Sequence, residues 1–434
     1  MRNRLLLSAA LLFSATAFSA CSESSKDPEP SDCEVEPCVD PVPLDCAPGT
    51  FDDGVASTCQ ACPADHWCAG DDADPVPHTV CDDDEVETTA PNASTDRECG
   101  PPVACTDDQT TRVVHASVSG VSGANACCHL HVGDVTVEDN DGWPTFEEEC
   151  LVVQGDVFIT GTEADPVDLA RVDGHLYVQD YDGTTLDVVS SVHHVTGTFT
   201  IHAANAISDL SGLSGLQVLE RELYLSSIAG IENLSGLDSL HTLGGLTLQT
   251  GLSFTDYAGI PNVTVIGAQG FTIAGSSTMP ADFTGLNHLG VIEGDFSIAE
   301  QENLSSLNGL DSLKVVVGTF LVNQAGALED LQGMPALSEI RGGISIVNNP
   351  VLLTMTGLDA ITTTEGQVNV GGNALIEDMT GLMNLAEVGG NLTIRGNARL
   401  CPVVAQAYLD DPMRQVDGNA IQTANGTEPG LVCP

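Results

Sequence analysis

Positively charged residues are scarce in this chain of 434 residues: 12 Lys and Arg stand against 62 Asp and Glu, for a formal charge of -50 at pH 7. A negative charge of this size repels nucleic acids and other polyanions, so no nucleic-acid partner is expected. Aromatic residues make up only 4%, which favours thin aliphatic layers over a single globular core. Beyond the N-terminus there is no run of about 18 apolar residues, so no membrane-spanning helix is predicted there.

Residues 1–20 have the composition of an export signal, in which a basic start precedes an apolar stretch from Leu5 to Phe18. The tetrapeptide FSAC, which ends at Cys21, resembles the lipobox of bacterial lipoproteins. That resemblance implies lipidation of Cys21 and, because Ser22 rather than Asp follows it, attachment to the outer membrane. The sequence does not distinguish the cell-surface side of that membrane from the periplasmic side. Two or more acyl chains give a stable anchor. The alternative is an ordinary secretory signal with an incidental cysteine.

Cysteine is abundant, with 15 residues, and this indicates an oxidising compartment. Residues 21–45 are rich in Pro, Ser and acidic residues, which predicts an extended tether between the membrane and the rest of the chain. Without a lipidated Cys21 the number of cysteines is even, so all of them can be paired. The disulfide candidates are Cys33, Cys38, Cys46, Cys59, Cys62, Cys68, Cys81, Cys99, Cys105, Cys127, Cys128, Cys150, Cys401 and Cys433.

Residues 46–100 hold six cysteines with almost no apolar residues between them, so a small module cross-linked by disulfides is predicted. The turn at Pro48–Phe51 and the step Cys59-x-x-Cys62 resemble the cysteine-rich repeats of tumour-necrosis-factor-receptor and GCC-type extracellular modules. The resemblance implies a spacer or a ligand contact. A zinc site at Cys59 and Cys62 is disfavoured because it requires a second ligand pair and a reducing compartment.

Residues 101–150 are predicted to cap the start of the domain that follows. A metal site at Cys128, His129 and His131 is an alternative, but disulfides would consume the thiols. The acidic segment Glu138–Gly142 looks like a calcium loop, yet it lacks the alternation and the distal Glu of an EF-hand, which favours a solvated turn. We therefore predict no cofactor, with Ca2+ as the weaker alternative. The cysteines expected to staple this cap are Cys105, Cys127, Cys128 and Cys150.

A 24-residue repeat organises residues 151–400. A period of this length is typical of a solenoid, in which each unit buries its apolar side against its neighbours. The repeat is clearest after residue 294, where four apolar columns recur. These columns are Leu304, Leu328, Leu352, Ile376 and Leu400; Leu307, Leu331, Met355 and Met379; Leu310, Met334, Leu358 and Leu382; and Leu313, Leu337, Ile361 and Leu385.

Each repeat also contains a short strand signature, Gly-x-Φ-x-Φ, where Φ is apolar. A spacing of two residues places both Φ side chains on the same, inward face of a strand. We therefore predict a mainly β fold, a right-handed parallel β-solenoid of about eleven coils with one parallel sheet. Residues 401–434 are expected to cap its end, with Cys401 and Cys433 holding the tail. The first Φ falls at Val157, Leu176, Phe199, Leu223, Leu246, Phe271, Phe296, Phe320, Ile344, Val368 and Leu392.

Two further columns share this register. Asn349, Asn373 and Asn397 are expected to point inward at a bend and to satisfy backbone groups of neighbouring coils. The Gly before each strand, such as Gly342, suits either a positive φ or a close contact between coils. The phrase L-x-x-Φ-x-G-x-Φ-x-Φ-x-x-N at 385–397 resembles the receptor L domain, the leucine-rich β-helix of insulin- and EGF-receptor ectodomains, and bacterial surface leucine-rich-repeat proteins share it. The resemblance implies a receptor-L-like coil without identifying a ligand.

The residue between the two Φ positions faces outward on every coil, and it is mostly Ser, Thr or Asn. Phe158, Tyr177 and Tyr224 are the aromatic exceptions. We predict that these three residues form a contact patch for a protein or a glycan. The alternative is that the N-terminal cap or the cysteine-rich module covers them.

No catalytic residue is predicted, because the sequence contains no nucleophile elbow, HExxH motif or phosphate loop. The leading hypothesis is a non-enzymatic recognition or adhesion protein. One alternative is a structural spacer of the cell envelope. The other is a β-helix enzyme that degrades polysaccharides, which would bring several carboxylates together in one groove.

Overall fold

The structure is a computed structural model that describes residues 128–138, 142–144, 150–162, 165–275 and 279–433 in full. Between residues 50 and 127 it describes the backbone of short strands only, so residues 1–49 and most of the predicted cysteine-rich module lie outside the described part. These strands pair antiparallel: β1 (Thr50–Phe51) with β2 (Gln60–Ala61), β3 (His66–Trp67) with β4 (Val76–Pro77), β5 (Val86–Thr89) with β6 (Glu98–Gly100), and β7 (Arg112–Val114) with β8 (Cys127–Val132).

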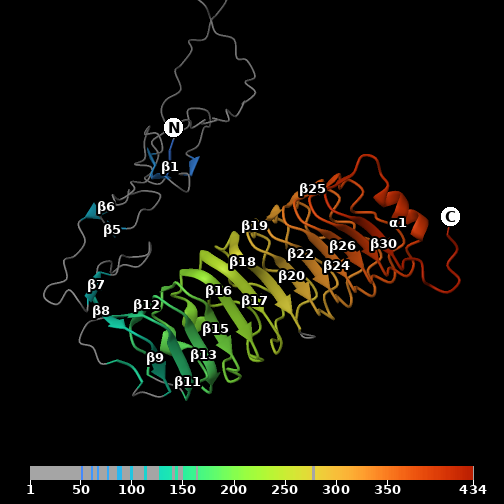
Figure 1. Cartoon of the computed structure of the whole chain (residues 1–434). Coiled ribbons are helices and arrows are strands. Elements are labelled where there is room, and N and C mark those ends of the chain that lie inside the picture. The colour runs from blue at the N-terminus through green and yellow to red at the C-terminus, as the bar shows by residue number, and fades with distance from the viewer. Residues whose placement is uncertain are drawn as a thin grey trace, which may run out of the picture.

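The described residues from 128 onward form the predicted parallel β-solenoid, with about twelve coils stacked along one axis (Figure 1). All eleven predicted strands are present and pair in the predicted register, for example Ile344 with Val368 and Val368 with Leu392. The sheet also gains β9 and β30 from segments that were expected only to cap it. This column consists of β9 (Val135–Val137), β11 (Val157–Gly161), β13 (Leu176–Tyr181), β15 (Phe199–His202), β16 (Val218–Ser226), β17 (Thr242–Leu248), β18 (Val265–Ala274), β20 (Phe296–Ala299), β22 (Phe320–Asn323), β24 (Ile344–Val347), β26 (Val368–Gly371), β28 (Leu392–Arg395) and β30 (Ala420–Thr423).

A second column of parallel strands was not predicted from the sequence. It runs beside the first, and β16, β17 and β18 are long enough to belong to both, with shifts of register in β16 and β17. Most of its other strands have only two residues, too few to produce a periodic signal in the sequence. They are β8 (Cys127–Val132), β10 (Leu151–Gln154), β12 (Leu169–Val172), β14 (His194–Val195), β19 (Val291–Ile292), β21 (Val315–Val316), β23 (Glu339–Ile340), β25 (Thr363–Thr364), β27 (Glu387–Val388) and β29 (Gln415–Val416).

The core is a continuous apolar filling between these strands and the turns on the remaining side of each coil. All four leucine-type columns are buried, as predicted. The middle coils hold a cluster of aromatic rings, in which Phe296 stacks on Phe271 at 5.3 Å between ring centroids and contacts Phe283 and Phe320. Helical structure in the described residues is limited to η1 (Asp187–Val189), η2 (Ser211–Leu213) and α1 (Pro402–Leu409).

The inward asparagines satisfy backbone groups across coils, which confirms the prediction made for them. Asn373 is fully buried; its Oδ1 accepts the backbone N–H of Asn349 at 3.0 Å and its Nδ2 donates to the carbonyl of Ile346 at 2.8 Å. Asn397 repeats the arrangement, and Asn425 continues it in the last coil. The ladder thus supplies partners to backbone groups that bend away from the sheets inside the core.

Close contact between coils, and not a positive φ, explains the glycine that precedes each strand. Gly342 has no positive φ, but a Cβ at this position would lie 2.4 Å from the carbonyl oxygen of Gly318 in the preceding coil. Positive φ occurs instead in the turns on the other side, as at Gly357 with a φ of 117°. Both glycine columns lie close to the preceding coil, and the column in the turns also requires a positive φ.

Candidate binding face

The predicted outward residues do form a ladder on the first column of strands. Phe158 in β11 pairs with Tyr177 in β13, which pairs with Thr200 in β15, which pairs with Tyr224 in β16. All four side chains are half-buried, between inward neighbours that are fully buried. The structure therefore brings Phe158 and Tyr177 together, whereas Thr200 separates Tyr224 from them.

Phe158 and Tyr177 form a parallel aromatic stack. Their ring centroids are 4.9 Å apart and the ring planes differ by 7°. The separation follows from the register, because neighbouring strands in a sheet lie about 4.8 Å apart. In this arrangement the two rings cover one face of each other, so their edges and only the outermost faces stay available. Contacts at ring edges are therefore favoured over flat stacking of a sugar ring between them.

Polar groups surround this stack. The His175 ring lies 5.8 Å from the Tyr177 ring, and its Nδ1 accepts the backbone N–H of Thr198 at 3.0 Å, so the neutral ring carries its proton on Nε2. Asp156 Oδ1 accepts the backbone N–H of His175 at 2.7 Å. Burial, with a smaller contribution from the Asp156 carboxylate, raises the pKa of Tyr177, so its hydroxyl stays protonated and can donate.

Tyr224 is held by a separate polar contact. Its hydroxyl donates to Oε1 of Gln249 in the next coil at 2.8 Å. On the same face Thr247 Oγ1 donates to the Glu222 carboxylate, and Ser226 bonds to the His202 ring at 2.6 Å. These contacts link adjacent coils. The hydroxyl of Tyr224 is therefore used in holding two coils together rather than being free for a ligand.

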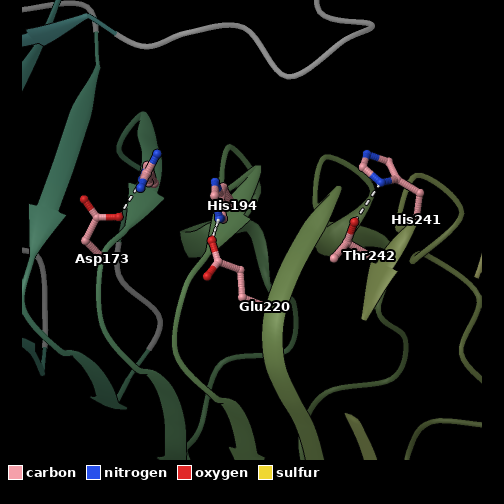
Figure 2. Close-up of polar contacts among 6 residues, drawn as sticks. Asp173, His194, Glu220, His241 and Thr242 are labelled. Atoms are coloured by element: carbon pink, nitrogen blue, oxygen red, sulfur yellow. Dashed lines mark hydrogen bonds and ion pairs between the residues drawn. The ribbon is translucent and has the colours of Figure 1, made fainter. Parts of the chain in front are cut away.

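Titratable residues lie in a row along the second column, which sequence reasoning missed (Figure 2). Arg171 and Asp173 form an ion pair at 2.5 Å, and His194 Nε2 lies 2.8 Å from Glu220 Oε1. His241 bonds to the Thr242 hydroxyl at 3.1 Å. Each contact is made within one coil or between neighbours, and Figure 2 shows them as separate pairs rather than a single cluster.

Two disulfides occur among the described residues, Cys128–Cys150 near the start of the solenoid and Cys401–Cys433 at its end. The first takes up the Cys128 thiol that the alternative metal site would need. The described residues as a whole contain no group of three or more His, Cys, Asp or Glu that could hold a metal ion. Residues 139–141 of the calcium-like segment lie outside the described part.

The side chains of the remaining predicted site residues lie outside the described part of the structure. The structure describes only the backbone of Cys99 and Cys127, within β6 and β8. The lipidation candidate and the other cysteines lie outside the described residues: Cys21, Cys33, Cys38, Cys46, Cys59, Cys62, Cys68, Cys81 and Cys105.

No known protein family matches the chain. No curated protein matches it either. Within the described residues, no helix is both long enough and apolar enough to cross a membrane.

Proposed function

We propose that the protein is a bacterial outer-membrane lipoprotein whose solenoid presents a non-enzymatic recognition surface. The observation that carries the proposal is the half-buried Phe158–Tyr177 stack on the outer face of the sheet. Most other described aromatic side chains are buried, so an aromatic pair at the surface calls for a partner. The buried ones are Tyr181, Phe199, Phe254, Tyr257, Phe271, Phe283, Phe296, Phe320 and Tyr408.

The chemistry of the face supports a protein or glycan ligand. Ring edges, the Tyr177 hydroxyl, the His175 Nε2–H and the Asp156 carboxylate offer apolar contact together with hydrogen-bond donors and an acceptor. The charge of -50 favours a neutral or basic partner over an acidic one. In this proposal the coils are of the leucine-rich, receptor-L-like kind, as their 24-residue repeat and asparagine ladder suggest.

A structural spacer is the second candidate. The regular coil stack and the short polar residues on most of the outer ladder support it, since such a body needs no ligand. The two candidates differ in whether the Phe158–Tyr177 pair matters for anything besides folding.

Replacing Phe158 and Tyr177 together by threonine is expected to lower ligand capture about tenfold or more, because aromatic side chains dominate the binding energy of such contacts. Threonine already occupies this ladder at Thr200 and Thr247, so the sheet tolerates it. The mature full-length protein would be tested in a cell-surface pull-down and on a glycan array. Leu321→Thr, on the same face in β22, is the matched control and should bind like the wild type. Equal capture by the double variant and the control would favour the spacer.

The lipid anchor is tested separately. Cys21→Ala is expected to abolish acylation and to release the protein from the membrane fraction, because no acyl chain remains to hold it. Cys33→Ala should stay acylated and serves as the control for loss of a nearby cysteine. Mass spectrometry of the N-terminal peptide and fractionation of cells give the readout. A Cys21→Ala protein that is still acylated would sink the lipoprotein proposal.

A further inference from the structure

The C-terminal end of the solenoid carries a concave pocket of about 660 Å³, far along the chain from the aromatic face. It lies between α1, the segment that follows it, and the turn at residues 378–383 of an earlier coil. Its volume falls within the range of roughly 300–1,000 Å³ that is common for small-molecule sites. The apolar lining consists of Met379, Met383, Val403, Val404, Ala407, Tyr408 and Pro412.

This end of the molecule exposes apolar side chains that the outer surface elsewhere mostly avoids. Met383 and Val403 are 59% and 55% exposed although they line the pocket, and Met413 beside it is 81% exposed. Single exposed apolar residues are common on protein surfaces, but several of them around one concave pocket are typical of a ligand-binding site.

The pocket is built on a rigid base. The Tyr408 hydroxyl donates to the carbonyl of Leu382 at 2.9 Å, which fixes α1 against the preceding coil. The buried Arg414 donates from Nε to the carbonyl of Leu385 at 2.8 Å, and its guanidinium lies 3.6 Å from the Tyr408 ring centroid. The Cys401–Cys433 disulfide holds the start of α1 to the tail. A ligand would therefore meet a largely preformed site.

Thr380 and three carboxylates, Asp378, Asp410 and Asp411, complete the lining. Asp411 is partly neutralised by Arg414 at 3.7 Å. Asp378 and Asp410 accept hydrogen bonds from neutral groups, the Thr380 N–H and the Gln406 amide, and the described residues offer neither of them an ion pair. Burial raises the pKa of Tyr408 to about 12, so its hydroxyl is neutral and the net charge at the pocket is negative.

We propose that this pocket binds a small amphipathic cation, an alkyl or aryl chain that ends in an ammonium or guanidinium group. The apolar walls would take the chain, and Asp378 and Asp410 would face the cationic end. The overall charge of -50 opposes an anionic ligand and a second copy of this chain at the same place. The volume exceeds what one side chain of a partner protein fills, which favours a free small molecule.

The first test compares three probes that share one apolar body, a phenyl ring on four methylene groups: 4-phenylbutylammonium, 4-phenylbutanol and 5-phenylpentanoate. The mature protein would carry 13C-labelled methionine methyl groups, and each probe would be titrated by NMR. The methyl groups of Met379 and Met383 should shift most with the ammonium, less with the alcohol and least with the carboxylate. Those of Met279 and Met334, buried in earlier coils, should stay unchanged.

The second test uses matched variants. Asp378→Asn should weaken binding of the ammonium about two- to fivefold, the effect of one exposed charge. Asn keeps the turn, because Asn233 accepts the N–H of Ser235 in the equivalent turn. Asp330→Asn, in the same column but outside the pocket, is the control and should bind normally. Ala407→Phe should place a ring in the pocket from the surface of α1 and, by occupying part of its volume, weaken binding of all three probes.

Equal affinity for the ammonium and the carboxylate would overturn the proposal, and so would undisturbed binding by Ala407→Phe. A tripeptide Lys-Phe-Lys that shifts Met379 and Met383 while the ammonium does not would also overturn it, in favour of a basic protein partner. Because these probes report on the C-terminal end alone, either outcome is independent of the result for Phe158 and Tyr177.

Discussion

Replacing Phe296 with alanine is expected to lower the free energy of unfolding by about 3–5 kcal/mol, the usual cost of truncating a buried aromatic residue. Phe296 is fully buried, and its ring contacts Phe271, Phe283 and Phe320 at centroid distances of 5.3, 5.8 and 5.5 Å. The loss of the ring leaves a cavity between three coils, because neighbouring strands are fixed in position by the sheet. Urea denaturation followed by circular dichroism gives the measurement.

Leu321→Ala is the control for this change. Leu321 is on the neighbouring strand β22, but it points outward and is half-buried, so its truncation should cost about 1 kcal/mol or less. Each repeat of a solenoid contacts mainly its neighbours, so amide exchange in the Phe296 variant should accelerate most in residues 271–320. A uniform change over the whole solenoid, or no change in stability, would contradict the role assigned to this cluster.

The second large effect is expected for Asn373→Leu, which should lower the free energy of unfolding by about 2–5 kcal/mol. Leucine has the same branched shape and number of side-chain heavy atoms as asparagine, but it leaves the N–H of Asn349 and the carbonyl of Ile346 without their partners. Each unsatisfied buried group costs about 1–3 kcal/mol. Water cannot replace the amide, because leucine occupies the space.

Asn384→Leu separates this effect from a general effect of the substitution. Asn384 is exposed and makes one hydrogen bond, to the carbonyl of Asp359 at 2.7 Å, so its loss should change stability by about 1 kcal/mol or less. Both variants would be compared with the wild type by urea denaturation. Similar midpoints for the two would show that the buried ladder contributes nothing beyond side-chain volume.

The regular part of this fold could be predicted from sequence because its signals are local and repeated. Phe296 and Phe320 sit one repeat apart and pair directly, as their spacing required. The inward position of Asn373 could be predicted because Asn349, Asn373 and Asn397 recur with the same 24-residue spacing. The second column could not be found in this way, because strands such as Glu339–Ile340 are only two residues long. At the C-terminal end, the Cys401–Cys433 disulfide agrees with the prediction, but strand β30, in the segment that follows the last repeat, was not predicted.

The candidate sites divide along the same line. The outward positions of Phe158 and Tyr177 followed from alternation along a strand, and the register places them side by side. The same register places Thr200 between Tyr177 and Tyr224. Alternation did not show that the two rings would stack with their faces covered, because stacking depends on the rotamers that neighbouring coils permit.

By itself, the sequence determined a stack of coils, the residues that point into it and those that point out, because periods of 24 and two residues are properties of neighbouring positions along the chain. Only the tertiary structure decided where a surface becomes a site. The pocket at α1 exists because Arg414 and Tyr408 hold a single helix against the turn at 378–383. Such contacts join segments without a common period, so no pattern in the sequence records them.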